Sequence, residues 1–112
     1  MMGIREDAIY YEFETEEEAK KILEMVEKLL NQIEDLYKSI FEYKIYICKE
    51  DIIDYISKRK ELCDIFLKYS NAKNVKELRK LTLNKLKRKV FSLTHFLTYI
   101  KQTCEIFLGS YG

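Results

Sequence analysis

Hydrophobic residues recur along two long stretches of the chain at alternating intervals of three and four residues. The first stretch comprises Ile22, Val26, Leu29, Ile33, Leu36, Ile40, Tyr43 and Ile47. The second comprises Leu83, Leu86, Val90, Leu93, Leu97, Ile100, Cys104 and Phe107. Because an α-helix completes a turn every 3.6 residues, positions with this spacing lie along one side of a helix. Each stretch therefore predicts a long amphipathic helix whose apolar seam faces a partner helix.

Capping signals place the ends of these helices. Thr15 is followed three residues later by Glu18, and Asn74 stands in the same relation to Glu77, which is the pairing typical of a helix start. Gly109 follows the last seam, and glycine often ends a helix. The sequence thus predicts an all-α fold, a bundle of long amphipathic helices with three main helices at about 16–48, 50–69 and 75–108.

Two segments also fit a second interpretation. Ala8 to Phe13 and Glu42 to Cys48 are rich in Ile, Tyr and Phe, which favour strands. They could flank the first helix as two strands, and that helix would then end near Ser39. A sheet of only two strands is marginally stable unless another chain extends it, so we expect the helical arrangement.

Length and composition favour a single helical domain, residues 1–112, with a core of its own and a cytoplasmic location. The longest stretch without a charged residue, from Val90 to Ile100, is too short to cross a membrane, and the N-terminus does not resemble a signal peptide. The scarcity of Gly and the lack of Pro suit an AT-rich genome, and the many Lys and Glu residues would also suit a thermophile.

The sequence predicts no metal and no cofactor. Cys48, Cys63 and Cys104 lie far apart and lack the spacing of zinc ligands, so we expect buried, reduced thiols. The chain has a single histidine and contains neither a glycine-rich phosphate loop nor a nucleophile elbow.

The unequal lengths of the predicted helices suggest a partner. A helix of about 30 residues is roughly 45 Å long, whereas the predicted middle helix reaches only about 30 Å, so part of one seam would lack a cover. A homodimer is the simplest completion, with an interface drawn from the two seams: Leu29, Ile33, Leu36, Leu93, Leu97 and Ile100. Alternatively, the long helices kink and fold back into a monomeric bundle.

Charge is distributed unevenly along the chain. Residues 1–42 hold 12 acidic and 5 basic side chains, whereas residues 68–89 hold 9 basic side chains and only Glu77 as an acid. A basic helix can follow the phosphates of a nucleic acid. The candidate contacts are Lys80, Lys85, Lys87, Arg88 and Lys89, with Asn84 and Tyr69 as supplementary contacts. In a second interpretation the acidic first helix and the basic last helix attract each other within the bundle or its dimer.

The only histidine lies in a polar stripe on the last predicted helix. Arg88, Ser92, His95 and Tyr99 are spaced by four, three and four residues, so they project from one face. Arg88 followed by His95 resembles the Arg and His signature of HEPN-family ribonucleases, which are small helical bundles with a composite active site formed across a homodimer. The resemblance implies proton transfer by His95 and phosphate stabilisation by Arg88. Lys89 departs from the small polar residue common there, and a surface or interface histidine is the alternative.

These observations predict a non-enzymatic helical interaction module. We expect a homodimeric subunit or accessory protein of a larger assembly, with a further protein partner or a nucleic acid as its ligand. A metal-independent ribonuclease that uses Arg88 and His95 is the enzymatic alternative.

Overall fold

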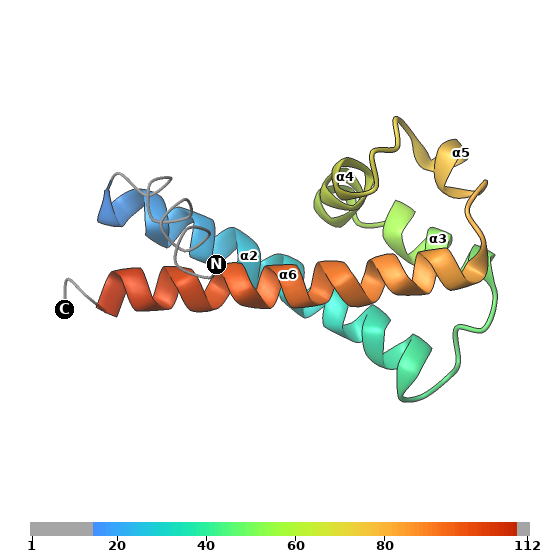
Figure 1. Cartoon of the computed structure of the whole chain (residues 1–112), viewed down its shortest axis with the longest axis horizontal. Helices are drawn as coiled ribbons and strands as arrows, with labels where there is room; N and C mark the ends of the chain where they lie inside the picture. The colour runs from blue at the N-terminus through green and yellow to red at the C-terminus, as the bar shows by residue number, and fades with distance from the viewer. Residues whose placement is uncertain (1–14, 110–112) are drawn as a thin grey trace, which may run out of the picture.

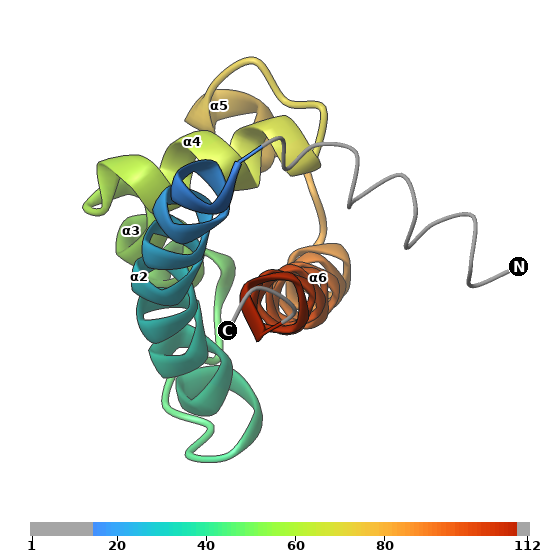
Figure 2. The same ribbon diagram turned by 90° about the vertical axis from the view of Figure 1, so that its left-hand side faces the viewer.

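The computed structural model describes residues 15–109 and confirms the all-α prediction (Figure 1). Helices make up 80% of these residues, and no strand occurs among them. Two long helices, α2 (Glu16–Phe41) and α6 (Leu83–Gly109), run antiparallel and pack against each other. Three shorter helices, α3 (Lys49–Ser57), α4 (Lys60–Tyr69) and α5 (Val75–Leu78), gather at one end of this pair. Figure 2, which looks along α6, shows α2 passing beside that helix and α4 and α5 above it.

The predicted helix starts are confirmed by hydrogen bonds. The Thr15 hydroxyl accepts from the backbone N–H of Glu18 at 3.1 Å, and the Asn74 side chain accepts from the N–H of Glu77 at 3.1 Å. Each bond satisfies one of the backbone donors that the first turn of a helix leaves without a partner.

The first helix is shorter than predicted, because it ends at Phe41 rather than near residue 48. The backbone N–H groups of Glu42 and Tyr43 both donate to the carbonyl of Lys38, and Lys44 adopts a left-handed conformation with φ of 54°. Tyr43 and Ile47, which continue the heptad spacing in the sequence, are 65% and 70% exposed. Residues 42–48 form no strand either, and the segment from Ala8 to Phe13 lies outside the described residues.

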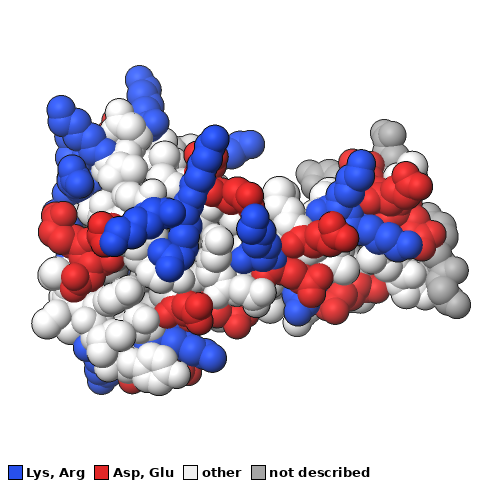
Figure 3. Space-filling view, turned by 180° about the vertical axis from the view of Figure 1, so that it is seen from behind, with Lys and Arg blue, Asp and Glu red and all other residues white. Residues whose placement is uncertain are grey.

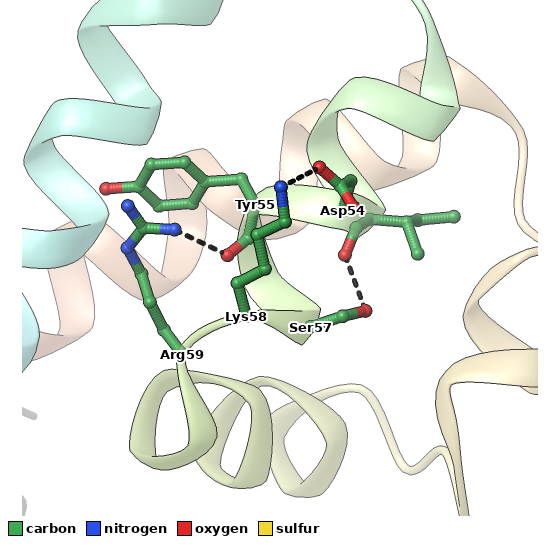
Figure 4. Close-up of polar contacts among 6 residues, drawn as sticks. Asp54, Tyr55, Ser57, Lys58 and Arg59 are labelled. Carbon is green, nitrogen blue, oxygen red and sulfur yellow. Dashed lines mark hydrogen bonds and ion pairs between the residues drawn. The ribbon is translucent and has the colours of Figure 1, made fainter.

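The predicted helix at 50–69 is divided into α3 and α4 at Arg59, which has an extended backbone (Figure 4). The Arg59 guanidinium lies 3.5 Å from the centre of the Tyr55 ring and donates to the backbone carbonyl of Tyr55 at 2.9 Å. Beside it, Lys58 forms an ion pair with Asp54 at 2.9 Å. Arg59 therefore satisfies a carbonyl at the end of α3, which helps the chain to turn here.

The predicted helix at 75–108 is also divided, because α5 ends at Leu78 and α6 begins at Leu83. The Thr82 hydroxyl accepts from the backbone N–H of Lys85 at 3.2 Å, so Thr82 caps α6 in the same way as Thr15 caps α2. This third cap was not predicted from the sequence.

The core lies where the seams of α2 and α6 meet the short helices. Phe66 from α4 and Ile52, Ile53 and Ile56 from α3 are almost wholly buried against those seams. Towards the other end, a small separate cluster consists of Ala19, Cys104 and Phe107. None of the helices in residues 15–109 is long and apolar enough to cross a membrane.

Candidate nucleic-acid interface

The antiparallel arrangement of the long helices separates their charges. The acidic first turn of α2 lies beside the C-terminal end of α6, whereas the basic residues of α6 begin at the opposite end of a molecule 45 Å long. Figure 3 shows basic side chains extending from the end that carries α4 and α5. The ion pairs described among residues 15–109 are Lys20–Glu16, Lys28–Glu61, Lys58–Asp54 and Arg79–Glu50. None of them joins α2 to α6, so direct pairing between these helices does not account for the basic stretch.

The five basic residues predicted to contact nucleic acid have accessible charges that no ion pair within residues 15–109 neutralises. Lys80, Lys85 and Arg88 are exposed, and Lys87 and Lys89 are half-buried. None of the five forms an ion pair within residues 15–109. Because these like charges follow one another around the start of α6, their positive potentials add.

The polar stripe predicted from the sequence lies on one face of α6. Arg88, Ser92 and His95 are exposed and Tyr99 is half-buried. With about 100° of rotation for each residue, Phe91 falls on one side of this stripe and Phe96 on the other. We use the name α6 face for the surface formed by this stripe, the flanking rings of Phe91 and Phe96, and the five basic residues Lys80, Lys85, Lys87, Arg88 and Lys89.

Other helices supply further rings on both sides of the α6 face. The Phe91 ring contacts Tyr37 and Phe41 of α2, with ring centres 6.0 and 6.3 Å apart. On the other side, the Phe96 ring lies 6.0 Å from the ring of Tyr69 in α4. These aromatic flanks were not predicted from the sequence, although Phe91 and Phe96 lie off the apolar seam and could have indicated them.

Two shallow hollows meet on the α6 face. One is lined by Phe41, Asn84, Lys87, Arg88, Phe91 and Ser92. The other is lined by Tyr69, Leu81, Lys85, Arg88, Lys89 and Ser92. Both hollows share Arg88 and Ser92, and each combines an aromatic ring with at least two cationic side chains. Asn84 and Tyr69, the predicted supplementary contacts, thus lie beside the basic residues.

His95 is held by its own helix. Its Nδ1 lies 2.9 Å from the backbone carbonyl of Phe91, and its ring lies against the Phe91 ring with centres 4.2 Å apart. Since a carbonyl oxygen only accepts, Nδ1 carries the proton in this contact, and Nε2 of the neutral ring is an acceptor. Arg88 lies two helical turns away, about 10 Å along the axis.

No family model, no curated protein and no solved structure matches this chain.

The residues predicted for a dimer interface lie inside the chain's own core. Leu29, Ile33, Leu36, Leu93 and Leu97 are buried, and Ile100 is half-buried against both clusters of core residues. They offer almost no surface to a second chain in this structure. A dimer of the folded chain would need other contacts.

The cysteines differ in their surroundings. Cys104 is buried and Cys63 half-buried, as expected, but Cys48 is exposed, so the prediction of a buried thiol is wrong for this residue. Cys48 lies in the stretch between α2 and α3, outside both helices. Residues 15–109 contain no group of three or more His, Cys, Asp and Glu side chains that could hold a metal ion.

Proposed function

We propose that this protein is a non-enzymatic helical interaction module that binds nucleic acid through the α6 face, as a subunit or accessory protein of a larger assembly. One observation carries this proposal: five basic side chains without an ion pair in the described part of the chain surround a face that also carries exposed aromatic rings. Phosphates are the complementary ligand for such a surface.

The physical basis is electrostatic. When lysine and arginine side chains neutralise phosphates, they release the counterions condensed on the nucleic acid, and the affinity then falls steeply as salt is added. Lys85, Lys87 and Lys89 occur within two turns of α6 and line the two hollows together with Arg88. Binding of this kind is sequence-tolerant, because contacts to phosphate carry no base information.

Fluorescence anisotropy with a labelled oligonucleotide tests the proposal. A triple variant in which Gln replaces Lys85, Lys87 and Lys89 should show no measurable binding at moderate salt. If it still binds, the slope of log affinity against log salt should decrease in magnitude by up to about 2.7. The matched control replaces Lys20, Lys21 and Lys101, which lie towards the opposite end, with Gln for the same change in charge. The control should keep the parent's salt slope.

Circular dichroism should confirm that both triple variants are folded. The proposal would be wrong if the folded Lys85, Lys87 and Lys89 variant bound as tightly as the parent, or if the parent bound no oligonucleotide at low salt.

A metal-independent ribonuclease is a second candidate, favoured by the orientation of His95. Its Nδ1 contact with the Phe91 carbonyl directs the accepting Nε2 away from that bond, as a general base requires, and Arg88 lies on the same face. Such an enzyme should cleave single-stranded RNA without added metal and leave 2′,3′-cyclic phosphate ends. His95→Ala and Arg88→Ala should each lower the rate by about a hundredfold or more while keeping the helical spectrum. Absence of cleavage, or cleavage unchanged in His95→Ala, would exclude this candidate.

A further inference from the structure

We infer that the α6 face takes single-stranded rather than duplex nucleic acid, with unpaired bases stacking on Phe91 and Phe96 on either side of the polar stripe. This inference rests on the proposed function and concerns the same face. It adds the class of nucleic acid and the groups that select it.

Three aromatic rings are exposed beside the basic residues. Phe91 is 44% exposed, Phe96 43% and Tyr69 38%. Burying an aromatic ring is strongly favourable, so rings left open beside cationic side chains are suited to a flat, negatively charged ligand. A nucleotide offers both a flat base and a phosphate.

Neighbouring rings support both exposed phenylalanines. Phe91 contacts Tyr37 and Phe41, and Phe96 contacts Tyr69. These contacts restrict the motion of both rings before any ligand arrives. A base that stacks on a restrained ring loses less free energy to ordering of the protein.

Arg88 lies where the two hollows meet, among aromatic rings and other cationic side chains. The two hollows share this residue, and Lys87 lies in one of them while Lys85 and Lys89 lie in the other. Arg88 lines the hollow that contains Phe91 and the hollow that contains Tyr69, so a strand that crosses the face can place one base at each of these rings with the intervening phosphates near Arg88, and a further base at Phe96, whose ring contacts Tyr69. Proteins that bind single strands without sequence preference combine these two elements, a basic surface and stacking rings.

A duplex can offer bases to the rings only by unstacking its base steps, which costs free energy. Its bases are already stacked on one another, and a phenylalanine side chain has no hydrogen-bonding group with which to identify base edges in a groove. An acidic protein partner could pair with the lysines, but it offers no base to stack on Phe91 and Phe96. Stacking on Phe91 and Phe96 therefore distinguishes a single strand from a duplex and from an acidic protein.

Single-tryptophan reporters test the stacking directly, because the chain contains no tryptophan. Phe91→Trp and Phe96→Trp each place one indole on the α6 face, and Tyr43→Trp, at a position 65% exposed after the end of α2, serves as the matched control. Each variant is titrated with oligo(dT), oligo(U) and a mixed-sequence duplex of equal length. Both single strands should quench the emission of the two face reporters at the concentrations at which anisotropy shows binding. The Tyr43→Trp emission should stay unchanged.

A second measurement removes the rings without changing the charge. Phe91→Leu and Phe96→Leu should each weaken binding of the single strand by about fivefold or more, since stacking contributes at least that factor for each base. Their salt slopes and their affinity for the duplex should remain those of the parent. Comparison of oligo(dT) with oligo(U) distinguishes DNA from RNA as the source of the strand.

The outcomes separate this inference from the proposed function. If the oligonucleotides bind with the expected salt and lysine dependence, but the indole emission does not change or the duplex binds as tightly as the single strand, the inference is overturned and the proposed function stands. If the parent binds neither kind of oligonucleotide, both are overturned. An acidic protein that binds the parent in place of nucleic acid would also overturn both.

Discussion

Replacing Tyr55 with Phe should weaken the contact that holds α3 against α2. The Tyr55 hydroxyl donates to the backbone carbonyl of Gln32 at 2.6 Å, and the residue is buried. Phenylalanine keeps the ring and its contact with the Arg59 guanidinium, so the variant loses little beyond the hydrogen bond. The free energy of unfolding should therefore fall by about 1 kcal/mol at pH 7, the usual net contribution of such a bond.

The same substitution should change how stability depends on pH. Burial raises the pKa of the Tyr55 hydroxyl above its ordinary value of 10.0, although the nearby Arg59 opposes this shift. Above pH 10 the unfolded chain loses this proton before the folded protein does, so the free energy of unfolding falls as pH rises. The slope of this contribution is at most about 1.4 kcal/mol for each pH unit. Below pH 10 the stabilisation is fully present.

Urea denaturation at pH 7 and at about pH 10.5 measures both effects. The parent should be more stable than Tyr55→Phe at pH 7, and this difference should narrow at the higher pH, because the variant has no hydroxyl to ionise. Tyr43→Phe, the same chemical change at an exposed position, is the control and should match the parent at both pH values. Equal stability of Tyr55→Phe and the parent at pH 7, or a difference that stays constant with pH, would refute this reasoning.

Three further predictions follow from the caps, the thiols and the seams. Thr82→Ala should lower the free energy of unfolding by about 1 kcal/mol in a urea titration, because the first turn of α6 loses its cap, and an unchanged midpoint would contradict that role. A thiol reagent near neutral pH should modify Cys48 first, then Cys63, and Cys104 only as the chain opens. Burial raises the pKa of the Cys63 and Cys104 thiols, so equal modification rates for the three thiols would argue against this order. If the predicted homodimer forms, light scattering should give twice the chain mass of 13.5 kDa, and a monomer at every concentration would exclude the homodimer. Leu29→Asp should unfold the protein because it places a charge in the core, and a stably folded variant would contradict this expectation.

The helical seams could be predicted because helix periodicity is a local property of the sequence. Ile33 and Leu36, or Val90 and Leu93, indicate the buried side of their helices whatever the tertiary structure. The end of α2 could not be predicted in this way, since Tyr43 and Ile47 keep the spacing while the backbone at Lys44 has already turned. Helix ends depend on hydrogen bonds to specific carbonyls, here those of Lys38 and Ser39, and the apolar pattern does not encode them.

The candidate site was predictable to a similar extent. The basic residues and the polar stripe occur within one helix, so sequence spacing alone could place Arg88 and His95 on one face. The rings of Phe41 and Tyr69 reach that face from α2 and α4, and only the packing of those helices brings them there. A surface assembled from separate helices has no local sequence signature.

The division of the core into two clusters has a consequence for motion in the native state. Among residues 15–109, the cluster of Ala19, Cys104 and Phe107 is small, and it is connected to the larger core through Ile22 and Ile100, which contact both. Fewer buried contacts mean a lower free energy for local opening. In hydrogen–deuterium exchange, the amides at the N-terminal end of α2 and the C-terminal end of α6 should therefore lose protection before those at the centre of α6. We expect this end to open as a subglobal unfolding unit while the basic end of the protein remains folded.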